Sequence, residues 1–170
     1  MPDHAPSTGP SPPTRIAALV GMISALGIAL SPLLVWWQQL LGLGLSLGGQ
    51  PAPQLFQYYY GSRTDAGKLV VFFGLICVGF WVQHALNARR WMQRPIARLL
   101  IYLYLTLSIG IAVVAVYAII NGLGVPDVWP AAQIGVGLYG LLGASLAQAA
   151  ALIWLVLERA SWAGMLKEQV

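Results

Sequence analysis

His84 is the residue in this chain that is best placed for chemistry inside a membrane, because it lies near the end of a long apolar segment. A buried ionisable side chain of this kind is a candidate ligand or a candidate proton carrier. Haem held by two histidines of one chain is excluded, since the other histidine is His4, in a tail with almost no apolar residues. A ligand role shared with another subunit stays open, beside a simple hydrogen-bonded packing role.

Gln148 is the second polar position of interest, and Ser145 lies one turn before it. Buried amides in membrane helices usually hydrogen-bond to a neighbouring helix, which contributes about 0.6–2 kcal/mol. We expect this role for Gln148. The alternative is a polar cavity or path that Gln148 shares with Gln83 and His84.

Other residues and motifs that could take part in catalysis or transport are scarce in the sequence. The acidic residues all fall in predicted tails or loops, and they are Asp3, Asp65, Asp127, Glu158 and Glu168. Coupled transporters usually place a carboxylate in the membrane, so this pattern argues against a coupled pump but not against a passive pore. A Walker loop, a zinc-protease motif and a serine nucleophile with a base are missing. We therefore expect a protein that is not an enzyme and holds no cofactor.

Small residues recur at helix-packing spacing in the last apolar segment. They form two sets, Gly140, Ala144 and Gln148, and Gly143, Ala147 and Ala151. Such spacing lets two helix backbones approach closely. Packing within one chain accounts for one set, so we expect the other to face a partner subunit.

A basic stretch, residues 87–98, divides the apolar segments that position these residues into two helical hairpins. It holds four of the nine basic residues, Arg89, Arg90, Arg94 and Arg98. Each arginine costs about 2.5–3.5 kcal/mol at the centre of a membrane helix, so this stretch must lie outside the bilayer. The chain is 58% hydrophobic and only 8% charged, against about 25% charged in soluble proteins. We infer an integral membrane protein, whose net charge of +4 needs no nucleic-acid partner.

The apolar segments predict one all-α membrane domain over residues 15–160, built as two helical hairpins. About 20 residues cross the hydrocarbon core, which is about 30 Å thick. Four segments reach or approach that length, and they are residues 16–37, 69–86, 99–120 and 132–157. We expect a disordered tail over residues 1–14 and a short tail over residues 161–170.

The distribution of basic residues predicts the orientation. Seven of the nine lie at the inner ends of the predicted spans, in the central stretch or in the tail after the last span, and two, Arg63 and Lys68, fall in the outer loops. Both termini are therefore expected to be cytoplasmic, and the protein to span the cell membrane. The outer loop over residues 38–68 is expected to lie partly in the interface, with Trp36 and Trp37 in the aromatic belt beside it. Whether residues 41–57 re-enter the membrane stays open.

The two hairpins are compatible with a tandem repeat, because Gly27-Ile28-Ala29 and Gly110-Ile111-Ala112 follow Arg15 and Arg98 at the same offset. The segments RLLIYLYL, at residues 98–105, and GFWVQHALNARRW, at residues 79–91, carry a resemblance as well. They resemble a two-helix bacterial membrane domain of unknown function, often found in tandem, particularly in green non-sulfur bacteria. The resemblance covers about residues 15–160 and implies no catalytic residue.

These observations favour a non-catalytic accessory or scaffold subunit of a larger bacterial membrane complex. An electron-transfer or other energy-converting assembly is a suitable host. The expected partners are the lipid bilayer and other membrane subunits. The alternative is a small oligomeric channel or carrier that uses Gln83, His84 and Gln148.

Overall fold

Four long helices and a small sheet make up the computed structural model, which describes residues 12–40, 56–92, 95–121 and 133–167. The helices are α1 (Pro12–Leu30), α2 (Asp65–Met92), α3 (Pro95–Asn121) and α4 (Val136–Lys167). Each is long and apolar enough to cross a membrane. By the length and apolar composition of its helices, the prediction of a four-helix, multi-pass membrane protein is confirmed. The side of the membrane that holds the termini stays a prediction.

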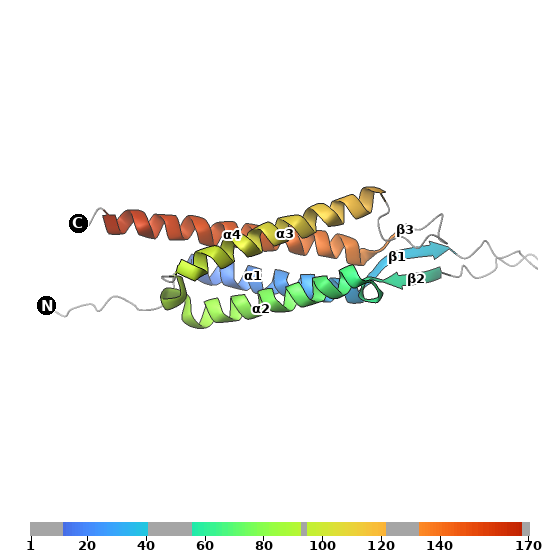
Figure 1. Cartoon of the computed structure of the whole chain (residues 1–170), viewed down its shortest axis with the longest axis horizontal. Helices are drawn as coiled ribbons and strands as arrows, with labels where there is room; N and C mark the ends of the chain where they lie inside the picture. Colours follow the sequence, from blue (N-terminus) through green and yellow to red (C-terminus); the bar gives the residue numbers. More distant parts are fainter. Residues whose placement is uncertain (1–11, 41–55, 93–94, 122–132, 168–170) are drawn as a thin grey trace, which may run out of the picture.

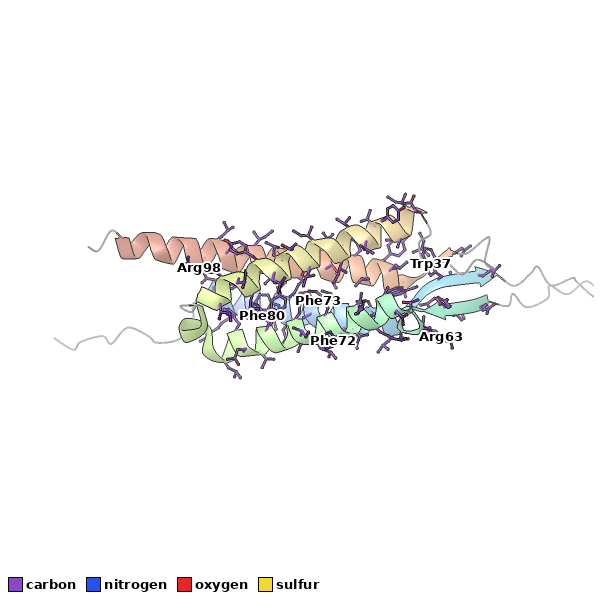
Figure 2. All side chains as sticks on the ribbon, viewed as in Figure 1. Trp37, Arg63, Phe72, Phe73, Phe80 and Arg98 are labelled. Atoms are coloured by element: carbon purple, nitrogen blue, oxygen red, sulfur yellow. The ribbon has the colours of Figure 1, made fainter. Side chains whose placement is uncertain are left out.

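The helices run along the long axis of the molecule (Figure 1). The start of α1 and the end of α4 lie at one end, here called the termini end. The three strands lie at the opposite end, the sheet end. Arg98 lies near the termini end, whereas Arg63 lies at the sheet end (Figure 2).

The first predicted span, residues 16–37, is wrong at its end. Helix α1 stops at Leu30, and a 3₁₀ turn (Ser31–Leu33) leads into strand β1 (Val35–Leu40). Pro32 has no amide hydrogen and clashes with the preceding turn of a helix, so the α-helix cannot continue through it. The Ser31 hydroxyl donates to the Ile28 carbonyl at 2.9 Å instead. Val35 and the two tryptophans that follow then favour a strand.

The other helices are longer than predicted. Helix α2 begins at Asp65 rather than at residue 69, and the Gly67 amide donates to Oγ1 of Thr64 at 2.8 Å, which caps the helix. Helix α3 begins at Pro95, because proline suits a first helical position. Helix α4 begins at Val136 rather than at residue 132, and it continues to Lys167, through most of the predicted tail. The basic stretch is therefore mostly helical.

A small three-stranded sheet, which was not predicted, accompanies the four helices. Strand β1 lies between β2 (Phe56–Tyr60) and β3 (Gln133–Ile134), and both pairings are antiparallel. Trp37 pairs with Tyr59 on one side and with Ile134 on the other. Because β1 precedes α2 and β3 precedes α4, the sheet joins the two predicted hairpins. Residues 41–57, whose re-entry into the membrane was left open, lie largely outside the described residues.

Trp36 and Trp37 are buried, at 8% and 2% exposure, so they pack inside the protein, and their place in the aromatic belt stays a prediction. Nε1 of Trp36 donates to the Ser31 carbonyl at 3.1 Å. A Cβ atom added at Gly61 or Gly137 would meet the Trp36 ring. These two glycines therefore leave the room that the indole fills between the sheet and α4.

Helices α1 and α4 are central to the bundle. Helix α1 packs along both α2 and α4, and α4 also packs along α3. Helices α2 and α3 touch over a much shorter stretch. Phe73 and Phe80 point from α2 toward α3 (Figure 2), where Tyr104 stacks edge-on against Phe80 with ring centroids 5.0 Å apart.

The tandem repeat stays a prediction, because its matching residues have different surroundings. A Cβ atom added at Gly27 would lie 3.0 Å from Cβ of Ala144, whereas one added at Gly110 would have no neighbour within 4 Å. Ile28 is fully buried and Ile111 only half-buried.

Candidate functional site: a buried polar cluster

Gln148 of α4 is the centre of a polar cluster between three helices. Its side chain is 0% exposed. Its Oε1 atom lies 2.8 Å from the Ser24 hydroxyl of α1 and accepts a 3.1 Å hydrogen bond from Nε1 of Trp81 of α2. The prediction that Gln148 hydrogen-bonds across helices is confirmed, and the amide joins three helices rather than two.

The indole of Trp81 fixes which way the Gln148 amide points. An indole N–H can only donate, so the atom facing it must be the amide oxygen. The Nε2 atom therefore points the other way, and it has no hydrogen-bond partner among the described residues. The Cys77 thiol lies beside the amide and offers only a weak acceptor.

Ser24 holds its place in this cluster through its own helix. Its hydroxyl lies within hydrogen-bond distance of the carbonyls of Val20 and Gly21 as well as of Gln148. The hydroxyl has one proton, so it donates to one of these acceptors at a time. Ser145, predicted near the site, donates instead to the Leu141 carbonyl of its own helix at 2.7 Å.

His84 lies on α2 one turn beyond Trp81, toward the termini end. The two rings meet edge to face, with centroids 5.8 Å apart. The imidazole is 1% exposed, and neither ring nitrogen has a hydrogen-bond partner among the described residues. The alternative that His84 is a ligand shared with a second subunit stays a prediction.

Glu158 was expected in the tail after the fourth span, and Asp65 in a loop. Both lie at the ends of helical segments that are long and apolar enough to cross a membrane, Glu158 as the last residue of the fourth and Asp65 as the first residue of the second. The Oε2 atom of Glu158 is buried.

Gln83 does not join this cluster, because its side chain is exposed. Consecutive residues of an α-helix point about 100° apart, so Gln83 faces outward where His84 faces inward. Of the predicted basic residues, Arg98 is exposed. The side chains of Arg89, Arg90 and Arg94 lie outside the described residues.

The two predicted small-residue sets do not form two separate faces. Gly140 and Gly143 are exposed, Ala144 and Ala147 are half-buried, and Gln148 and Ala151 are buried. Positions four residues apart rotate by about 40° around a helix at each step. Each set therefore winds from the outer surface of α4, near the sheet end, into the core.

Sequence reasoning missed Trp81 and Ser24 as parts of the site. A Cβ atom added at Gly21 would overlap the Trp81 ring, so this glycine makes the space in which the indole reaches Gln148. Two features of the sequence could have indicated these residues: the spacing of Gly21 and Ser24 in α1, and a single tryptophan, Trp81, inside the second apolar segment. Neither feature shows that the partner is Gln148, because that depends on how the helices pack.

No family model, curated protein or solved structure matches this chain. The resemblance to a tandem two-helix membrane domain stays a prediction. In the described part of the chain, no three His, Cys, Asp or Glu side chains come close enough to hold a metal ion.

Proposed function

We propose that this protein is a non-catalytic subunit of a larger membrane complex and that the outer surface of α4 contacts a partner helix. One observation carries the proposal: Gly140 and Gly143 lie one turn apart on the exposed surface of α4 without a packing role within the chain, whereas the other open glycines that the structure describes, Gly79 and Gly110, lie singly on α2 and α3.

The packed glycines are explained by close contacts. Gly21 makes room for Trp81, Gly27 approaches Ala144, and Gly74 approaches the backbone of Ala29. Glycine costs about 1 kcal/mol relative to alanine in a helix, and close packing compensates for that cost. Gly140 and Gly143 would meet nothing within 4 Å if they carried a Cβ atom. A partner helix packed on them would supply the missing contact.

The polar interior supports a structural role. Gln148 is engaged with Ser24 and Trp81, which ties α1, α2 and α4 together. The alternative, a channel or carrier, requires Gln83, His84 and Gln148 to line one path. Gln83 is exposed on α2 while the other two are buried, which favours the subunit proposal.

The test is native mass spectrometry of the complex after extraction from the source membrane in mild detergent. We expect defined partner subunits at fixed stoichiometry. Replacing Gly140 and Gly143 together by leucine should remove the partner without lowering the thermal stability of the isolated protein. Gly110→Leu is the matched control, since Gly110 is equally open but lies on α3.

The proposal is wrong if the extracted protein carries no partner, or if the double leucine variant retains its partner fully. Loss of the partner in the Gly110→Leu protein alone would place the interface on α3 and overturn the assignment to α4.

A further inference from the structure

Arg63, at the sheet end (Figure 2), is an exposed cation that no carboxylate neutralises among the residues that the structure describes. Its guanidinium carbon, Cζ, lies 6.0 Å from the centre of the Tyr60 ring, in a cation–π contact. The next cation along the chain, Lys68, is paired with Asp65 at 2.8 Å. Two positive charges and one negative charge therefore leave a net charge of +1 at this place.

The backbone on both sides of Arg63 is held in place. Tyr60 ends strand β2, and a 3₁₀ turn (Gly61–Arg63) leads from it to the start of α2. The Thr64 hydroxyl donates to the Gly61 carbonyl at 2.7 Å and closes this turn. Arg63 and Tyr60 are therefore presented together, and little backbone freedom is lost when a ligand binds to them.

The depth of this turn follows from the apolar side chains that α2 exposes. Leu69 and Phe72 are the exposed large apolar residues nearest to the start of the helix, at 69% and 63% exposure. Asp65, where the helix begins, lies about 6 Å beyond Leu69 along the helix axis, from a rise of about 1.5 Å per residue. The headgroup layer is about 5–7 Å thick on each side of the hydrocarbon core. The long side chain of Arg63, which precedes Asp65, therefore reaches the level of the lipid phosphates.

A phosphate group suits this arginine. The planar guanidinium forms two parallel hydrogen bonds to two phosphate oxygens, and stacking on a ring leaves the N–H groups in its plane free to donate. Tyr60 is 36% exposed, and tyrosine is common at headgroup depth because its ring is apolar and its hydroxyl is polar. The net positive charge favours a lipid with a net negative charge over a zwitterionic one.

We propose that Arg63, stacked on Tyr60, binds the phosphodiester group of an anionic phospholipid in the leaflet at the sheet end. The acyl chains of that lipid lie along α2, over Leu69 and Phe72. The site is separate from the proposed partner face on α4, so either proposal can fail without the other.

The experiment is photocrosslinking of the full chain in phosphatidylcholine nanodiscs that hold a small fraction of phosphatidylglycerol with a diazirine next to its glycerol backbone. Mass spectrometry of the peptides locates the labelled residues. Arg63→Gln removes the group that binds the phosphate, and Arg63→Lys keeps the charge without the planar fork. Arg98→Gln is the matched control, because it removes one exposed arginine at the termini end and changes the net charge of the chain equally.

We expect labelling at the sheet end, within residues 56–72, in the reference protein. Arg63→Gln should lower this labelling about fivefold, the order that one basic residue contributes near an anionic lipid surface. Arg63→Lys should lower it by less, and Arg98→Gln should leave it unchanged.

The absence of labelling at the sheet end overturns the proposal, and so does an Arg63→Gln protein that loses no more labelling than Arg98→Gln. Equal labelling by a phosphatidylcholine probe with the same diazirine overturns the preference for an anionic lipid. If Arg63→Gln does not fold, Arg63→Lys decides, and labelling as strong as in the reference protein overturns the role of the guanidinium group.

Discussion

Nε1 of Trp81 donates a 3.1 Å hydrogen bond to Oε1 of Gln148, and this bond connects the first hairpin to the second inside the bundle. The same oxygen lies 2.8 Å from the Ser24 hydroxyl, so one amide joins three helices. Gly21 makes the contact possible, because any larger residue there would occupy the space of the indole ring.

Replacing Gln148 by alanine should lower the stability of the folded protein by about 1–2 kcal/mol. The indole N–H of Trp81 would lose its acceptor, and an unpaired buried donor costs about 1–3 kcal/mol, partly offset by the removal of the unpaired Nε2 atom. Thermal unfolding in detergent, followed by circular dichroism, measures the change. Gln83→Ala is the control, since that side chain is exposed, and it should change stability by less than about 0.5 kcal/mol. Equal effects of the two variants would contradict the proposed role of Gln148.

Alanine at Gly21 should destabilise the bundle by about 1–3 kcal/mol, because the added methyl group overlaps the Trp81 ring and forces it to move. Gly79→Ala is the matched control, since Gly79 lies in open space on α2. Alanine is the better helix former, so the control should be neutral or stabilising by up to about 1 kcal/mol. A stable Gly21→Ala protein would show that the indole does not occupy this space.

Phenylalanine at Trp36 should cost about 1–3 kcal/mol. The change removes the hydrogen bond to the Ser31 carbonyl and leaves part of the space between the sheet and α4 unfilled. Trp154→Phe is the control, because Trp154 is 51% exposed on the outer surface of α4. Thermal unfolding of both variants separates a packed tryptophan from an interfacial one. The assignment of Trp36 to the sheet-end core is wrong if the control loses as much stability as Trp36→Phe.

Thiol labelling tests the predicted orientation. The native Cys77 is 0% exposed and should not react with a maleimide until the protein is unfolded. In a Cys77→Ala background, Asp65→Cys should react with a membrane-impermeant maleimide on intact cells, since the Asp65 side chain is 95% exposed at the sheet end. Ser161→Cys should react only after the membrane is permeabilised. The reverse pattern would place both termini outside.

The number and approximate positions of the four helices can be predicted from the lengths of the apolar segments and the positions of the arginines, because both are local properties of the sequence. Helix ends were less predictable, because Pro32 and the Thr64 cap act over a few residues and the hydropathy average hides them. The end of α4 shows the same effect: the helix continues through Glu158 although hydropathy falls there.

The sheet was missed for a different reason. VWWQQL, at residues 35–40, and FQYYY, at residues 56–60, are aromatic enough for strands, but they flank apolar segments whose hydropathy suggested a helix and an interfacial loop. The third strand has only two residues, Gln133 and Ile134, so its pairing with β1 depends on the arrangement of the helices.

The candidate site was predictable in its residue types and not in its contacts. Gln148 and His84 were identifiable as polar residues in apolar segments. How α2 and α4 are rotated about their own axes decides that Gln83 faces outward and that Trp81 meets Gln148. A sequence without a clear amphipathic pattern does not define that rotation.

The position of α1 between α2 and α4 has a consequence for the order of assembly during synthesis. When α1 and α2 have left the ribosome and entered the membrane, the face of α1 that holds Ser24 and Ile28 still lacks its partner, which is the last helix of the chain. In the nascent hairpin the Trp81 N–H therefore still lacks its Gln148 acceptor, whereas the Ser24 hydroxyl can donate to a carbonyl of its own helix. Insertion of α4 completes the bundle in one step, so truncations before residue 136 should be recognised by membrane quality control as unassembled.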